Sequence, residues 1–152
     1  MDSFTKAIAA VEKKCSALLS VRTYKVGALP KAMPAKGIYL FSQNGKFLYV
    51  GRTNNMRKRL QYHTRNNHNQ ATFAFLLARH KTGKMKASYQ KADSRSDLLT
   101  QPRFLKAFIK ARNDIRQMDV QFIAEANANR QALLEICAAM RTKAKYNGFD
   151  NH

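Results

Sequence analysis

Two kinds of hydrophobic pattern alternate along the chain, and together they predict a mixed α+β fold. From about Ser3 to Ser20 the apolar residues recur every three or four positions, which indicates an amphipathic helix with Ser3 as a candidate N-cap. Further along, the runs GIYLFS and KFLYVG are rich in β-branched and aromatic residues. They flank Asn44-Gly45, a pair typical of a tight hairpin turn. We therefore expect a helix, a connector containing two prolines, and then a β-hairpin.

The rest of the chain predicts one more strand among further helices. After the hairpin a helix is expected from about Asn55 to Thr64. The segments QATFAFLLARHK and PRFLKAFIKARNDIR also have helical character, with Pro102 near the start of the second. The segment GKMKASYQKADSRSD between them is basic and expected to be a loop. Near the C-terminus, MDVQFIAE predicts a strand and NRQALLEICAAMRTKA a helix with Asn129 as a candidate N-cap.

The charge balance narrows the class of partner. The chain has 152 residues, and its 28 Lys and Arg against nine Asp and Glu give a formal net charge of +19, while hydrophobic residues make up 45%. That hydrophobic content excludes a disordered tail, so the positive charges must repel one another in a compact fold. A polyanion would relieve the repulsion. We expect a nucleic acid, with an anionic membrane surface as the alternative; no apolar run approaches the roughly 18 residues of a spanning helix.

Cysteine usage and the N-terminal pattern predict an intracellular protein, cytoplasmic or nucleoid-associated. Cys15 and Cys137 form no metal-binding spacing and are expected to be free thiols in helices. The first apolar stretch is interrupted by Glu12, Lys13 and Lys14, which does not fit a secretory signal.

The hairpin and the helix after it carry side chains that suit phosphodiester hydrolysis. Tyr39 and Tyr49 project on one face of the hairpin if the strand register has the right parity. Arg59 and His63 are four residues apart on the predicted helix, and Arg52 lies just before it. Hydrolysis requires a general base for water and a fixed cation for the charge that develops on phosphorus. A tyrosine becomes a base only where cations or a metal lower its pKa, and the two arginines are candidates for that role.

These residues resemble the GIY-YIG endonuclease family. GIY stands at residues 37–39 and YVG at residues 49–51, with one mild change from YIG, and Arg59 and His63 follow at the family's spacing. The resemblance implies an α+β fold with a small three-stranded antiparallel sheet flanked by helices. It also implies hydrolysis of a phosphodiester with one divalent metal ion, Mg²⁺ or Mn²⁺, per active site.

Roles for five residues follow from the same resemblance. Tyr39 is the preferred general base, with Tyr49 orienting the water or the phosphate, and the two roles are exchangeable. Arg59 would stabilise the phosphorane, Arg52 would assist, and His63 would position a phosphate or relay a proton.

The resemblance further implies one metal-binding glutamate on a later helix. The chain has three glutamates: Glu12 precedes the motifs, Glu125 ends the third predicted strand, and Glu135 lies on the helix after it. Glu135 is therefore the expected metal ligand, the alternative being a carboxylate paired with Lys or Arg. Tyr146-Asn147 resembles the YN that closes many family members, so Asn147 is expected to support the site.

We expect a single compact domain in which residues 1–35 form a helix and connector and residues 36–152 the nuclease, with a basic insertion at about 66–117. Expected partners are DNA, duplex or branched, and a second copy of the chain for double-strand cleavage; RNA stays an open alternative. The alternative function is a nucleic-acid-binding module of the same fold that does not cut. The candidate phosphate contacts are Arg57, Lys58, Arg65, Lys84 and Lys86.

Overall fold

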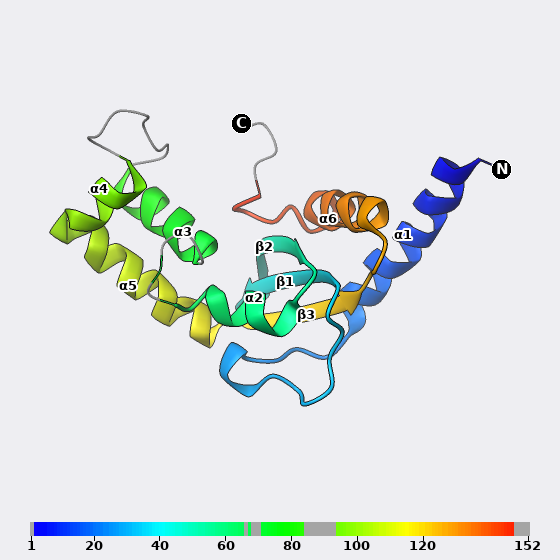
Figure 1. Ribbon diagram of the computed structural model, residues 1–152, viewed down its shortest axis with the longest axis horizontal. Helices are drawn as coiled ribbons and strands as arrows, with labels where there is room; N and C mark the ends of the chain where they lie inside the picture. The colour runs from blue at the N-terminus through cyan, green and yellow to red at the C-terminus, as the bar shows by residue number, and fades with distance from the viewer. Residues whose placement is uncertain (1, 66, 68–70, 84–93, 148–152) are drawn as a thin grey trace. The chain divides into compact units, whose positions relative to one another are not determined.

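The structure confirms the mixed α+β class. The computed structural model describes residues 2–65, 67, 71–83 and 94–147 (Figure 1). Its elements in chain order are α1 (Ser3–Ser20), the 3-10 turn η1 (Val26–Ala28), β1 (Gly37–Gln43), β2 (Lys46–Thr53), α2 (Met56–Tyr62), α3 (Thr72–Thr82), α4 (Arg95–Thr100), α5 (Pro102–Gln117), β3 (Asp119–Ala124) and α6 (Ala128–Thr142).

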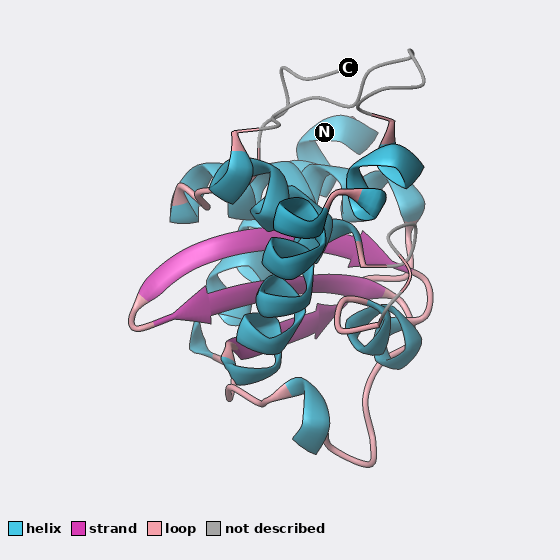
Figure 2. Cartoon of the chain, turned by 90° about the vertical axis from the view of Figure 1, so that its left-hand side faces the viewer, coloured by secondary structure: helices cyan, strands magenta, loops and turns pink. Residues whose placement is uncertain are grey.

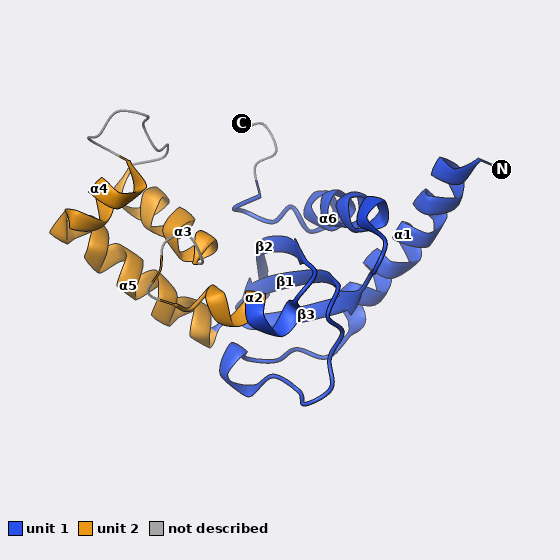
Figure 3. Cartoon of the chain, viewed as in Figure 1, with its two compact units in different colours: residues 1–58, 118–152 blue, residues 59–117 orange. Residues whose placement is uncertain are grey.

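The chain divides into two compact units, coloured separately in Figure 3. Unit 1 comprises Met1–Lys58 and Met118–His152 and holds the sheet with α1 and α6. Unit 2 comprises Arg59–Gln117 and holds α3, α4 and α5; the boundary passes through α2. The expected insertion at about 66–117 falls within unit 2, while the organisation as one domain stays a prediction.

Unit 1 is built on the predicted hairpin. β1 and β2 pair antiparallel, and β3 pairs antiparallel with the other edge of β1, so the strand order is β2-β1-β3 (Figure 2, strands in magenta). At the turn Asn44 and Gly45 have φ values of 53° and 77°, the left-handed conformations that a two-residue hairpin turn requires. The three-stranded antiparallel sheet that the resemblance implied is thereby confirmed.

The glycine of the GIY motif allows β3 to approach β1. A Cβ built at Gly37 would lie 2.0 Å from the backbone oxygen of Ile123 and 3.1 Å from the Cα of Ala124. Both neighbours are backbone atoms of the paired strand, so neither can move aside without shifting the ladder. The pairing of β1 with β3 therefore requires glycine at this position.

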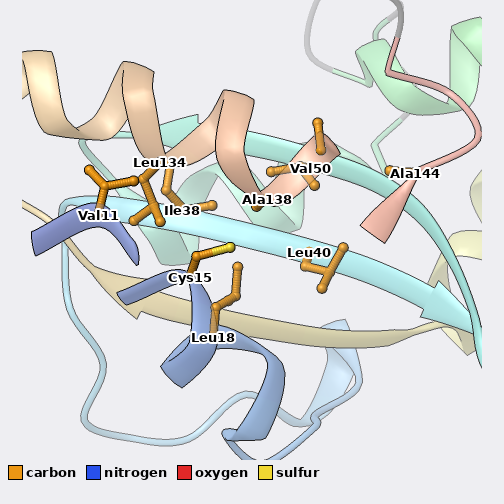
Figure 4. Close-up of a cluster of buried hydrophobic side chains, with 10 residues drawn as sticks. Val11, Cys15, Leu18, Ile38, Leu40, Val50, Leu134, Ala138 and Ala144 are labelled. Carbon is orange, nitrogen blue, oxygen red and sulfur yellow. The ribbon is translucent and has the colours of Figure 1, made fainter. Parts of the chain in front are cut away.

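One face of the sheet is covered by α1 and α6. Their apolar faces pack with alternate residues of β1 and β2 (Figure 4). The fully or nearly buried members are Val11, Cys15 and Leu18 from α1, Ile38 and Leu40 from β1, Val50 from β2, Leu134, Ala138 and Ala139 from α6, and Ala144 just after it.

The caps of α1 and α6 differ from the predicted ones. The side chains of Asp2 and Asn127, rather than those of Ser3 and Asn129, accept hydrogen bonds from the backbone N–H three residues later. Both caps have extended backbone and precede the first helical residue, which is the geometry a cap needs. Each predicted helix exists, and each begins with a cap other than the one expected.

Unit 2 has an aromatic core. The ring centroid of Phe75 on α3 lies 5.0 Å from that of Phe104 and 6.2 Å from that of Phe108, both on α5. One prediction here was wrong, because Arg95–Thr100, partly assigned to a loop, forms α4. Ser94 caps this helix, and its buried Leu98 provides the apolar anchor that so short a helix needs.

The structure also bears on two expectations, one about the cysteines and one about membrane-spanning helices. Cys15 and Cys137 are both free thiols, the first buried and the second half-buried, each on a helix of unit 1. Across the described part of the chain, none of the helices combines the length and the apolar content of a membrane span.

Candidate active site

The strand register brings the two motif tyrosines to one face of the hairpin. Tyr39 pairs with Gly51, and Phe41 pairs with Tyr49. Paired residues of antiparallel strands project on the same side, as do residues two apart on one strand. Tyr39 and Tyr49 therefore share a face, and their ring centroids are 6.4 Å apart. This face is opposite to the one that packs against α1 and α6.

The tyrosine of GIY and the glycine of YVG fit each other. A Cβ at Gly51 would lie 2.2 Å from both Cζ and Oη of Tyr39, so the ring passes directly over the glycine. Tyr39 is 1% exposed and also meets Phe41 edge-to-face at 5.8 Å, whereas Tyr49 is only half-buried. The phenol of Tyr39 is thus fixed by packing, and that of Tyr49 is the more open of the two.

Arg52 lies on the other side of the sheet from the tyrosines. It pairs with Ile38, whose side chain belongs to the core against α1 and α6. Its exposed side chain is therefore on the α6 side of β2, where Glu135 is its neighbour.

Glu135 is a half-buried carboxylate at the edge of β2. Burial raises its pKa above the usual range, although the Arg52 guanidinium and a hydrogen bond from the Arg52 backbone N–H act in the opposite direction. The raised pKa means that the protein alone does not fully compensate the negative charge. A cation bound here would do so.

Asn147 binds the outer edge of β2 as a strand would. Its side-chain oxygen accepts from the Val50 N–H at 2.7 Å, and its amide nitrogen donates to the Val50 carbonyl at 2.8 Å. Next to it the Tyr146 N–H donates to the Leu48 carbonyl at 2.9 Å. Because Tyr49 lies between these two anchored residues, Asn147 supports the position of a motif tyrosine through the backbone.

Gln131 was not predicted as a site residue, and it binds the loop that follows β2. Its buried amide donates to the Asn54 side-chain oxygen at 3.1 Å and to the Glu125 carbonyl at 2.6 Å. Gln131 and Glu135 are four residues apart on α6, so one helical face holds both the end of β2 and the loop after it. The sequence signal that could have identified Gln131 is a polar residue one helical turn before Glu135.

The predicted helix pair lies in unit 2. Arg59 is half-buried and donates from Nη2 to the Thr72 hydroxyl at 2.8 Å. The His63 imidazole is fully buried and meets Phe73 edge-on at 6.3 Å. Burial, and secondly the charge of Arg59, lower the pKa of His63 to about 3. The imidazole is therefore neutral at physiological pH, and its role in positioning a phosphate or relaying a proton stays a prediction.

The buried His63 is expected to make stability depend on pH. Its pKa is about 6.5 when unfolded and about 3 when folded, so the unfolded chain binds the proton first as pH falls. Stability from this group is complete above pH 6.5 and declines below it, by about 2 kcal/mol between pH 7 and pH 5. Urea unfolding at both pH values should show this loss in the wild type and in the exposed-site control His80→Gln, and a smaller loss in His63→Leu. Equal losses in all three would contradict it.

The candidate phosphate contacts differ in their surroundings. Arg57 is tied to the connector, since its Nη2 donates to the carbonyls of Pro30 and Lys31. Lys58 is exposed, and Arg65 is exposed with its guanidinium 4.7 Å from the centroid of the Tyr62 ring. Lys84 and Lys86 lie outside the described residues.

The residues around Glu135 fit a hydrated metal ion better than a closed metal site. No cluster of three or more His, Cys, Asp or Glu side chains occurs among the residues that the structure describes. Mg²⁺ commonly binds through one or two carboxylates, keeps several waters, and takes further ligands from a substrate phosphate. A single half-buried carboxylate matches that demand.

A comparison with protein families assigns the fold to a known class. The model of the GIY-YIG catalytic domain matches residues 35–116, more than half of the chain. The chain belongs to the GIY-YIG catalytic domain family, a family of nucleases. The matched range includes both motifs, Arg59 and His63, and ends before Glu135 and Asn147. No curated protein and no solved structure matches the chain significantly.

Proposed function

We propose that this protein is a divalent-metal-dependent DNA endonuclease that hydrolyses phosphodiester bonds. The observation that carries the proposal is Glu135, a half-buried carboxylate of raised pKa at the edge of the strand that bears Tyr49. Family membership supports nuclease activity in general, and the metal, the DNA substrate and the residue roles belong to the proposal. An ionised carboxylate in this environment is unfavourable unless a cation accompanies it.

Each residue of the proposed mechanism has one task. Glu135 would hold Mg²⁺ or Mn²⁺, and the ion when bound supplies Lewis-acid stabilisation of the phosphoryl oxygens. Tyr39, as the phenolate that remains once its own hydroxyl proton has left to solvent, would accept the proton of the attacking water, with Tyr49 as the alternative base. Arg59 stabilises the charge that develops on the phosphorane, and Arg52 assists by its charge beside Glu135. His63 acts as a neutral group that orients its neighbours.

The partners follow from charge and stoichiometry. A formal net charge of +19 supports a polyanionic substrate, which we take to be duplex or branched DNA, with RNA open. One metal site cuts one strand, so a double-strand break requires a homodimer or two sequential events. The free thiols Cys15 and Cys137 support an intracellular setting.

The tyrosine mechanism predicts a loss of cleavage in Tyr39→Phe. Removing a general base lowers the rate by about 10²–10⁴-fold, while the ring that packs over Gly51 is retained. Nicking of supercoiled plasmid with Mg²⁺ measures the effect, with Tyr146→Phe as the matched control that should cleave like the wild type. A parallel Tyr49→Phe variant decides the base: the larger loss identifies it, and two unchanged rates would rule out a tyrosine base.

The second candidate is a binding module of the same fold that does not cut. The burial of Tyr39 and the neutral, buried His63 favour it. It predicts DNA binding without product at any Mg²⁺ or Mn²⁺ concentration, so a cleavage product that requires metal excludes it.

A further inference from the structure

A stacked pair of aromatic rings lies at the edge of the sheet formed by β3. Tyr24, in the connector after α1, forms a two-way backbone bridge with Val120 of β3: its N–H donates at 2.9 Å and its carbonyl accepts at 2.8 Å. Its ring stacks on Phe122 with a centroid distance of 5.6 Å and an interplanar angle of 20°. The backbone bridge fixes the position of Tyr24 independently of what its ring does.

This pair lies on the sheet face of the motif tyrosines. Phe122 is the register partner of Tyr39, and Val120, which bridges Tyr24, is the partner of Phe41. Partners across antiparallel strands project on one side, so the Tyr24 and Phe122 rings continue the row that Tyr39 and Tyr49 begin. The aromatic row therefore runs from β2, across β1, to the outer edge of β3 within unit 1.

Accessibility distinguishes the outer edge of the row, at β3, from its middle, at β1. Tyr39 and Phe41 are 1% and 0% exposed, whereas Tyr24 and Phe122 are both only half-buried. The exposed guanidinium of Arg22 lies 5.3 Å from the centroid of the Tyr24 ring. A pair formed only to fill the core would be covered like its neighbours, but this one keeps part of its surface open and carries a cation.

We propose that Tyr24 and Phe122, with Arg22, form a stacking subsite for an unpaired nucleobase of a single-stranded DNA segment. Stacked aromatics beside a cation are the features by which proteins hold single strands without regard to sequence, since every base has a π-face and every linkage a negative charge. The carboxylate of Asp119, at the start of β3, is paired with Lys25 at 2.9 Å. The subsite rests on the proposed function, because it lies on the same face of the sheet as Tyr39. It makes branched or single-stranded DNA the preferred substrate over intact duplex.

The test separates stacking from cleavage. Full-length protein in EDTA is titrated with single-stranded oligonucleotides that carry 2-aminopurine, and with the matching duplex. For the wild type we expect 2-aminopurine fluorescence to be quenched at one or two positions of the bound single strand. Tyr24→Leu, which keeps the backbone bridge and an apolar side chain, should weaken single-strand binding at least about fivefold. Tyr24→Phe should bind like the wild type, and binding of the duplex should change less than about twofold in both.

Several results would overturn the subsite. They are wild-type binding without quenching at any position, preference for duplex, or equal loss of single-strand and duplex binding in Tyr24→Leu. If Tyr24→Leu unfolds, which its melting temperature reports, Phe122→Leu takes its place and should show the same selective loss. EDTA prevents metal-dependent cleavage, so the binding test does not depend on nuclease activity. Selective single-strand binding supports the subsite even if the protein proves not to cut. Cleavage by a protein that shows no selective single-strand binding supports the nuclease proposal and contradicts the subsite.

Discussion

Glu135→Gln is expected to abolish metal-dependent cleavage, with a loss of about a thousandfold or more. The amide keeps the shape of the side chain and removes the charge that would hold the metal. Lewis-acid stabilisation by a divalent ion amounts to several kcal/mol of transition-state energy, and each 1.36 kcal/mol is about tenfold in rate. Single-turnover cleavage of labelled DNA with Mg²⁺ measures the loss.

The same variant is expected not to lower stability in metal-free buffer. The folded state raises the pKa of Glu135, so it binds the proton more tightly than the unfolded chain does. Ionisation of this group therefore lowers stability above the raised pKa, and the penalty is absent below the ordinary pKa of glutamate. Gln removes the penalty at neutral pH. Mg²⁺ or Mn²⁺ should raise the melting temperature of the wild type and leave that of Glu135→Gln unchanged.

Glu12→Gln is the matched control, because Glu12 is exposed on α1 and undergoes the same change in charge. It should cleave and respond to metal like the wild type. A Glu135→Gln enzyme with wild-type cleavage would show that the metal, if one is used, is held elsewhere.

Gly37→Ala is expected to destabilise the protein by about 3 kcal/mol or more. The added methyl would stand 2.0 Å from the Ile123 carbonyl oxygen, in the middle of the β1–β3 ladder. Overpacking a rigid site costs about 1–3 kcal/mol, and a clash with backbone lies at or above the upper end. Urea unfolding at pH 7 measures the change.

Gly27→Ala provides the control for this prediction. A Cβ at Gly27 meets nothing within 4 Å and its backbone needs no left-handed φ, so stability should change by less than about 0.5 kcal/mol. Unfolding midpoints that agree between the two variants would show that β3 can shift away from Gly37, and that the motif glycine has no structural role.

Local signals were sufficient for the elements with strong patterns. Asn44-Gly45 determines the hairpin because few residues adopt positive φ, and the apolar periodicity of the first 20 residues determines α1. The spacing of Tyr39 and Tyr49 around that turn was enough to place them on one face. By contrast α4 has six residues and a single buried leucine, so only packing in unit 2 shows it to be a helix.

The features of the site that the sequence did not predict depend on packing between elements. Arg52 was expected to follow the end of the strand and to lie near the tyrosines. Instead β2 continues to Thr53, and because side chains alternate between the two faces of a strand, Arg52 lies on the α6 side. The neutral state of His63 follows from its complete burial, where Phe73 is one of its contacts, and from the charge of Arg59. Tyr24 belongs to a connector without regular pattern, and only its bridge to Val120 reveals which face it joins.

The most direct test of the proposed function is a cleavage time course on supercoiled plasmid and branched DNA, with Mg²⁺, with Mn²⁺ and with EDTA. The wild type and Glu135→Gln are compared at one temperature, well below the melting temperature of both. We predict product only with metal and only from the wild type. Cleavage in EDTA, or equal cleavage by Glu135→Gln, would contradict a metal-dependent nuclease centred on Glu135.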